Sequence, residues 1–302
     1  MSIRTTASRN QPFDSSTDPA LDPDLDRLSR RDLLGRASAA VVCTSAVSQQ
    51  PAVRALEDTS IEKEEVTYPS QGGGGTERRI QAFLAVPKTA GKRGSVIVIH
   101  EIFGLTDHIK DVTCRLAQAG FTALGVNLFT REGAPPPTSG GFAPLMQFVS
   151  AIPDRQILDD LKAAMAYLRA LSNGKVGVVG FCWGGRISML LDASAPDLNA
   201  AVAYYGRISG EKTANQPAFP IDVVAQMRAP LLGHFGAQDT GIPPAEANKL
   251  REALKAHHKT AEIFEYQDAG HAFNNDTRES YRPAAAHLAW QRTLDWFRKY
   301  LD

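Results

Sequence analysis

The sequence predicts an α/β fold in which a mostly parallel, doubly wound sheet carries helices on both faces. Short runs rich in β-branched residues, such as Ser95–His100, recur along the chain and are typical of buried strands. Longer segments with helical character separate these runs, and the alternation of strand and helix favours a parallel sheet. The 302 residues show no internal repeat, so we expect one folded domain, residues 57–302, after a leader of residues 1–56.

The first two strands are expected to differ from the others. Glu64–Pro69 and Ile80–Val86 are joined by the glycine run Gly72–Gly75, which predicts an antiparallel hairpin. The Pro- and Gly-rich segment Arg131–Gly141 is expected to be either a lid or a long connection. The later strands are expected at Ser95–His100, Phe121–Phe129, Lys175–Gly180, Ala200–Tyr205, Leu231–Phe235 and Glu262–Tyr266. The helices are expected before Ala119-Gly120 and at Pro153–Leu171, Trp183–Asp192, Pro244–His257 and Arg282–Tyr300.

The charge balance argues against a nucleic-acid partner. Lysine plus arginine and aspartate plus glutamate number 33 each, which gives a formal net charge of zero. The three cysteines, Cys43, Cys114 and Cys182, are too few to indicate a disulfide framework. A cysteine in this chain is therefore expected to serve chemistry or core packing.

The leader has the pattern of an export signal. A polar stretch over residues 1–28 precedes Arg30-Arg31, and the weakly apolar run Ala37–Ser48 follows. This order resembles a bacterial twin-arginine (Tat) signal, with cleavage expected near Ala55. The apolar run is too short for a stable membrane anchor. We expect a periplasmic or secreted protein that uses the Tat export machinery, or a cytoplasmic one if the arginine pair is accidental.

A candidate nucleophile lies between a predicted strand and a predicted helix. The segment Gly180-Phe181-Cys182-Trp183-Gly184 has the pattern G-x-S-x-G with cysteine in place of serine. Glycines allow the sharp turn, and the amino end of the following helix favours a thiolate and an oxyanion. The alternative is a buried, inert cysteine. The strand–turn–helix context favours a catalytic Cys182.

Two further residues follow strands in the order that this turn predicts. Asp239 follows the strand Leu231–Phe235, and His271 follows the strand that ends at Tyr266. His271 would accept the thiol proton, and Asp239 would orient its ring. Alone, Asp239 could be a helix cap and His271 a surface residue. Together with Cys182 they predict a Cys-His-Asp triad on an α/β-hydrolase fold.

From Glu64 to its end, the chain resembles the dienelactone hydrolase (carboxymethylenebutenolidase) family. The resemblance is carried by His100–Leu105, Asn173–Gly185, Tyr204-Tyr205-Gly206 and Gly270–Phe273. It implies a cofactor-free hydrolase that opens a small lactone or ester through a thiol acyl-enzyme.

The resemblance also implies further site residues. Glu101 matches the family's signature glutamate, which contacts the resting nucleophile and yields it as thiolate when substrate enters. Without the resemblance, Glu101 would be read as a solvated loop carboxylate. The backbone amides of Ile102 and Trp183 match the expected oxyanion hole.

Substrate recognition departs from the family pattern. Arg131 matches the first of two arginines that hold a substrate carboxylate, but Asn275 stands in the place of the second. Arg278 lies nearby in sequence and could substitute for it. The predicted substrate-binding residues are Arg131, Phe103, Tyr205, Phe273 and Asn275. No histidine has convincing companions for a metal site: His100, His108, His257 and His258 are expected at the surface or in the core.

Two alternatives to a lactone hydrolase stay open. The fold hosts many chemistries, so a general carboxylesterase that takes other acyl substrates is possible. A non-catalytic small-molecule binder on the same scaffold would not need Cys182, Asp239 and His271 together.

Overall fold

The computed structural model of the chain describes residues 55–73, 76–88 and 93–302. The predicted export signal and Cys43 lie outside the described residues. Ala55 and Leu56, which the sequence assigned to the end of the leader, belong to the short 3-10 helix η1 (Ala55–Glu57). Ala55 is buried and its backbone N–H donates to Asp111 Oδ1 at 2.9 Å. These two residues therefore pack with the folded domain.

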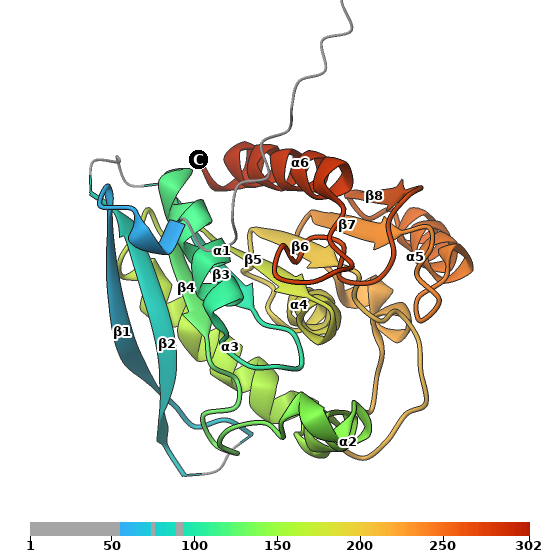
Figure 1. The fold of residues 1–302 in the computed structure, drawn as a ribbon, viewed down its shortest axis with the longest axis horizontal. Coiled ribbons are helices and arrows are strands. Elements are labelled where there is room, and N and C mark those ends of the chain that lie inside the picture. Colours follow the sequence, from blue (N-terminus) through green and yellow to red (C-terminus); the bar gives the residue numbers. More distant parts are fainter. Residues whose placement is uncertain (1–54, 74–75, 89–92) are drawn as a thin grey trace, which may run out of the picture. The chain divides into compact units, whose positions relative to one another are not determined.

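Eight strands form one sheet in the order β1-β2-β4-β3-β5-β6-β7-β8 (Figure 1). The hairpin predicted at the start is confirmed: β1 pairs antiparallel with β2, and β2 pairs antiparallel with β4. All later pairings are parallel, so β2 is the reversed strand of this sheet. The strands are β1 (Ile61–Ser70), β2 (Arg78–Pro87), β3 (Ser95–Ile99), β4 (Thr122–Val126), β5 (Val176–Phe181), β6 (Ala200–Tyr204), β7 (Leu231–Gly236) and β8 (Ala261–Tyr266).

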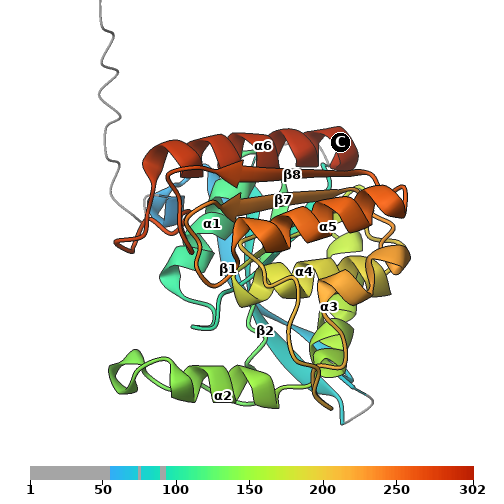
Figure 2. The ribbon, with the colours of Figure 1, turned by 90° about the vertical axis from the view of Figure 1, so that its right-hand side faces the viewer.

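Helices cover both faces of the sheet, as predicted (Figures 1 and 2). One core places α1 and α6 against β3, β5 and β6, and the other places α3, α4 and α5 against the opposite face. Side chains of β3–β6 are buried on both faces, which explains their continuous apolar runs. The helices are α1 (Asp107–Gln118), α2 (Ala143–Ala151), α3 (Asp154–Arg169), α4 (Trp183–Ser194), α5 (Pro244–Ala256) and α6 (Pro283–Leu301).

Helix α2 was not predicted from the sequence. It follows the Pro/Gly loop, which itself contains a 3-10 turn at Thr138–Gly140. Only Leu145 and Val149 of α2 are buried, while Phe142 and Met146 are 57% and 44% exposed. Apolar residues on both faces hide the amphipathic pattern by which a surface helix is recognised.

The sheet gathers the loops that follow its parallel strands at one edge. The carboxyl ends of β3, β5, β7 and β8 lead into the segments that hold Glu101, Cys182, Asp239 and His271. This arrangement brings together residues that lie up to 170 positions apart in sequence. No helix within the described ranges is both long and apolar enough to cross a membrane.

Candidate active site

Cys182 occupies a strained turn between β5 and α4. Its backbone has φ 56° and ψ −114°, a conformation that residues other than glycine rarely adopt. The glycines around it are required sterically. A Cβ on Gly180 would lie 1.9 Å from the carbonyl oxygen of Gly184, and a Cβ on Gly184 would lie 2.6 Å from the carbonyl oxygen of His100. The pattern G-x-C-x-G therefore follows from close backbone packing at this turn.

The structure brings Cys182, His271 and Asp239 into one hydrogen-bonded chain. His271 Nε2 lies 3.1 Å from Cys182 Sγ, and His271 Nδ1 lies 2.7 Å from Asp239 Oδ2. The other carboxylate oxygen of Asp239 accepts the backbone N–H groups of Gly241 and Ile242 at 2.9 and 3.0 Å. Asp239 is buried and held from both sides, so it fixes the orientation of the imidazole.

The environment of His271 favours its protonated form. Burial lowers the pKa of His271, but its hydrogen bonds to Asp239 and Cys182 and the charges of those groups outweigh burial and raise the pKa to about 10. The side chain is still 40% exposed, so solvent reaches the ring. An imidazolium between a carboxylate and a sulfur is suited to moving a proton to and from that sulfur.

Glu101 is buried at the end of β3 rather than solvated. Its Oε2 accepts a hydrogen bond of 2.9 Å from Asn275 Nδ2. Asn275 is also buried, and its Oδ1 accepts the backbone N–H and the hydroxyl of Thr277 at 3.1 and 2.6 Å. Asn275 therefore contacts the predicted acid, which the sequence did not indicate.

Two backbone N–H groups are available beside Cys182. Trp183 is the first residue of α4, where an N–H has no acceptor within its own helix. In the described part of the chain, neither its N–H nor that of Ile102 donates to another protein group. Ile102 directly follows Glu101. Two free donors at a helix start and a neighbouring loop can stabilise a developing oxyanion.

Tyr205 packs against the imidazole of His271, and Phe273 packs against Tyr205 in turn. Tyr205 is buried with φ 39°, and its ring centroid lies 5.1 Å from that of His271 and 5.5 Å from that of Phe273. Burial raises the pKa of Tyr205 well above its ordinary range, and the charges of Glu101 and Cys182 raise it further. Its hydroxyl has no hydrogen-bond partner among the described residues.

Phe103 is partly buried and is contacted on two sides. The Arg278 guanidinium lies 4.1 Å from the centroid of its ring, and Phe142 at the start of α2 makes an edge contact at 6.3 Å. Within the described ranges, Arg278 makes no ion pair. A cation and an aromatic side chain thus lie next to each other close to Glu101.

The structure does not bring Arg131 into this group. Its Nη2 donates to Asp160 Oδ1 at 2.8 Å and to the Ser70 carbonyl at 3.0 Å, and its Nε donates to Asp160 Oδ2 at 3.1 Å. These bonds tie the loop after β4 to β1 and α3. With its guanidinium engaged by a buried carboxylate, Arg131 is poorly placed to hold a substrate anion.

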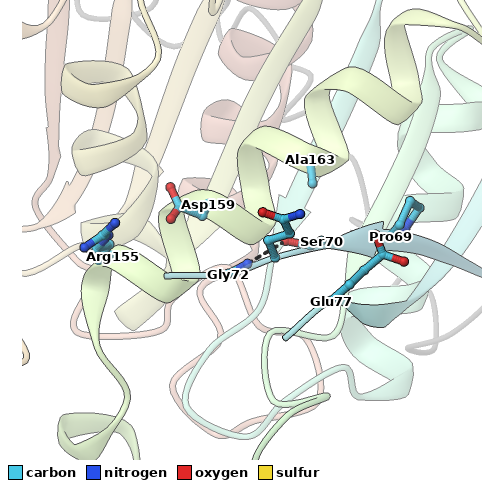
Figure 3. Close-up of a pocket in the computed structure, with 8 residues that line it drawn as sticks. Pro69, Ser70, Gly72, Glu77, Arg155, Asp159 and Ala163 are labelled. Carbon is cyan, nitrogen blue, oxygen red and sulfur yellow. Dashed lines mark hydrogen bonds between the residues drawn. The ribbon is translucent and has the colours of Figure 1, made fainter. Parts of the chain in front are cut away.

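A surface hollow lies beside this ion pair rather than beside Cys182. It has a volume of about 440 Å³ and is lined by β1, α3 and the segment between β1 and β2. Figure 3 shows Ser70 and Gly72, joined by a hydrogen bond, with Glu77, Arg155 and Asp159 around them. A Cβ on Gly72 would lie 2.5 Å from Arg131 Nη2. None of the lining residues was predicted to act in the site.

His100, His108 and His234 are buried and have structural contacts, whereas His257 and His258 are exposed. His100 is fully buried, and its two ring nitrogens contact the Glu101 carbonyl at 2.6 Å and the Leu128 N–H at 3.2 Å. Burial lowers the pKa of His100 to about 4, so the ring is neutral. Over the described residues, no group of three His, Cys, Asp or Glu side chains could hold a metal ion.

Comparisons with known proteins assign the chain to a family. Residues 80–301 match the model of the dienelactone hydrolase family. Curated relatives provisionally named carboxymethylenebutenolidase are 38% identical in Methylorubrum extorquens, over 93% of this chain and 98% of the relative, and 41% identical in Escherichia coli K12, over 88% and 95%. A crystal structure from Klebsiella pneumoniae, provisionally named a dienelactone hydrolase, is 42% identical and superposes with a TM-score of 0.74, covering 80% of this chain and 99% of the other. The chain therefore belongs to the dienelactone hydrolase family and is a hydrolase of the α/β-hydrolase fold.

Proposed function

We propose that the protein opens a small lactone or ester by nucleophilic attack of Cys182, with His271 and Asp239 completing a triad. The observation that carries this proposal is the continuous contact from Cys182 Sγ through His271 to Asp239. The strained turn at Cys182 supports it, because backbone strain is retained where the surrounding structure and function require it.

The reaction proceeds in two halves. With its proton held on His271 Nε2, the Cys182 sulfur attacks the carbonyl carbon as a thiolate, and the N–H groups of Ile102 and Trp183 hold the oxyanion that forms. The carbon–oxygen bond to the leaving group breaks, and His271 returns the proton to that oxygen. Water then attacks the thioester and gives its proton to His271, and the carbon–sulfur bond breaks, which releases the acid and restores the Cys182 thiolate beside the protonated His271.

The contacts favour substrates with at most one anionic group. Arg131 is engaged by Asp160, and Asn275 supplies a neutral amide where the family pattern has an arginine. Arg278, stacked on Phe103, is the remaining cation for an anionic substrate. The ring of Tyr205 packs against His271 and Phe273 packs behind Tyr205, both fully buried. A neutral ester is the second candidate substrate, favoured by the engagement of Arg131.

The test is hydrolysis of a panel that pairs p-nitrophenyl acetate with neutral and anionic lactones. Cys182→Ala should abolish turnover with an unchanged melting temperature, because only a surface-accessible sulfur is lost. Cys114→Ala is the matched control, since this second cysteine is buried in the core and makes no contact with His271. Turnover that survives Cys182→Ala would exclude the proposed nucleophile. If no compound of the panel is turned over but one binds tightly, the alternative of a non-catalytic small-molecule binding protein is favoured.

We also propose that the segment before Ala55 directs export through the Tat system, on the evidence of Arg30-Arg31 and the weakly apolar run after them. Replacing both arginines by lysine keeps the charge but removes the recognised pair. The wild type should be found in the periplasmic fraction of a bacterial host and the double variant in the cytoplasm. Arg54→Lys is the control. Equal distribution of wild type and double variant would contradict export by this route.

A further inference from the structure

Two loops of the proposed site meet at the hydrogen bond between Asn275 and Glu101. Glu101 belongs to the loop between β3 and α1, and Asn275 belongs to the loop between β8 and α6 that also carries His271. The bond from Asn275 Nδ2 to Glu101 Oε2 is 2.9 Å long and both side chains are buried. The direction of the Asn275 amide therefore decides whether Glu101 meets a donor or an acceptor.

Thr277 fixes that direction. Its backbone N–H and its hydroxyl both donate to Asn275 Oδ1, at 3.1 and 2.6 Å. With its oxygen occupied by two donors, Asn275 can present only its NH₂ group to Glu101. The contact between Asn275 and Glu101 also matters for charge. An arginine in this place would neutralise the Glu101 carboxylate, whereas the neutral amide holds it by a hydrogen bond alone.

The residue between Asn275 and Thr277 is anchored on the other loop's helix. Asp276 accepts from His108 Nδ1 at 3.1 Å and from the Arg115 guanidinium, and both partners lie on α1. Burial raises the pKa of Asp276, but the His108 hydrogen bond and the charge of Arg115 outweigh it and lower the pKa to about 2. Because α1 begins directly after the Glu101 loop, this contact joins the two loops a second time, behind the site.

We propose that Asp276, held by His108 and Arg115, and Thr277 are positioning residues that present the Asn275 amide to Glu101 and so hold this acid in place after β3. The inference rests on the proposed function and on the contact with the nucleophile that the family resemblance implies for Glu101. His108 Nε2 is buried without a hydrogen-bond partner among the described residues, and burial of an unpaired nitrogen costs stability. A purely structural role for the contact between His108 and Asp276 does not account for that cost. Neither Asp276 nor Thr277 touches the reacting atoms, so both act through Asn275.

The measurement is the rate at which iodoacetamide alkylates Cys182 at neutral pH, followed by mass spectrometry of the peptide that contains it. This rate depends on thiolate content and needs no substrate. Asn275→Ala should change the rate by about threefold or more, and Asp276→Asn and Thr277→Val should change it in the same direction. Thr277→Ser keeps the hydroxyl and should stay close to the wild type. Thr277 is exposed, so its variants are expected to fold.

A double-mutant cycle separates positioning from general destabilisation. If Asp276 acts through Asn275, Asp276→Asn should have little further effect in the Asn275→Ala background. Asp295→Asn removes an exposed partner of Arg298 and is the matched control. Equal effects of Asp276→Asn in both backgrounds, equal rates for Thr277→Val and Thr277→Ser, or an unchanged rate in Asn275→Ala would each overturn the proposal. Failure of ester turnover would count against the proposed function alone, since alkylation is measured without it.

Discussion

The cluster around Cys182 and the cluster around Arg131 both place charged groups in buried surroundings, but they differ in how completely their polar atoms are paired. Asp160 accepts from Ser70 Oγ and from two nitrogens of Arg131, and its carbonyl accepts the Tyr68 hydroxyl. Beside Cys182, the Tyr205 hydroxyl and the Trp183 indole N–H lack partners in the described part of the chain.

We expect this difference to separate a structural site from the proposed reactive one. Buried polar groups in proteins are normally paired, and those left unpaired call for an explanation such as a missing ligand. The Arg131 cluster meets that norm, and the described lining of the open hollow beside it includes no buried polar atom without a partner (Figure 3). The Cys182 cluster departs from it, with unpaired donors and a strained backbone together. Substitutions should therefore cost activity in one cluster and stability in the other.

The largest effect on activity, after loss of Cys182 itself, is expected for Asp239→Asn. The amide oxygen can still accept from Gly241 and Ile242, so the loop should keep its shape. Its NH₂ group, however, would face His271 Nδ1 and force the ring into the wrong tautomer. We expect kcat to fall by roughly 10³- to 10⁴-fold with little change in melting temperature. A kcat within tenfold of the wild type would remove Asp239 from the triad.

The opposite outcome is expected for Asp160→Asn. It leaves the Arg131 guanidinium partly buried without its carboxylate, which should lower the free energy of unfolding by roughly 3 kcal/mol. The kcat for a neutral ester should stay within about twofold, because these side chains make no contact with the triad. Denaturant unfolding and ester kinetics on the same preparation test both statements. A large loss of activity on anionic substrates alone would instead return Arg131 to substrate recognition.

The same contrast explains what could be predicted from sequence. The sheet and the positions of Cys182, Asp239 and His271 follow from local patterns: β-branched runs, glycines at the elbow and polar residues at strand ends. Arg131 and Asp160 are neighbours only in the fold, so the sequence gives no sign that this arginine is engaged. The family resemblance implied that Arg131 binds substrate, because it matches residues by their position in the sequence. It carries no information on Asp160, the partner of Arg131 in the fold.

The contacts behind the site were missed for a related reason. Asp276 and Thr277 lie beside Asn275 in sequence, but their roles depend on which way that loop turns and on α1 behind it. Helix α2 was missed because its apolar side chains are divided between the core and solvent. In both cases the deciding interactions are tertiary and leave no periodic pattern.

The smallest expected effect is the change in the His271 pKa when Cys182 is replaced by serine. This change reports directly on the contact between Cys182 and His271. Its pKa of about 10 lies above the ordinary value of 6.5, so its contribution to stability is complete below about pH 6.5 and is lost as pH rises toward 10. Since the side chain is 40% exposed, solvent screening keeps this contribution small. In Cys182→Ser the sulfur charge is absent, so the His271 pKa should fall and stability should depend less on pH in this window.

Histidine NMR across this range, on the wild type and Cys182→Ser, measures the shift directly. His100 and His234 serve as internal controls, because burial lowers their pKa values to about 4 and about 3 and neither should titrate in the window. An unchanged His271 pKa in the variant would mean that Asp239 alone holds the proton on the ring. The sulfur would then be a neutral thiol at rest, and its activation would have to come from Glu101 or from the arriving substrate.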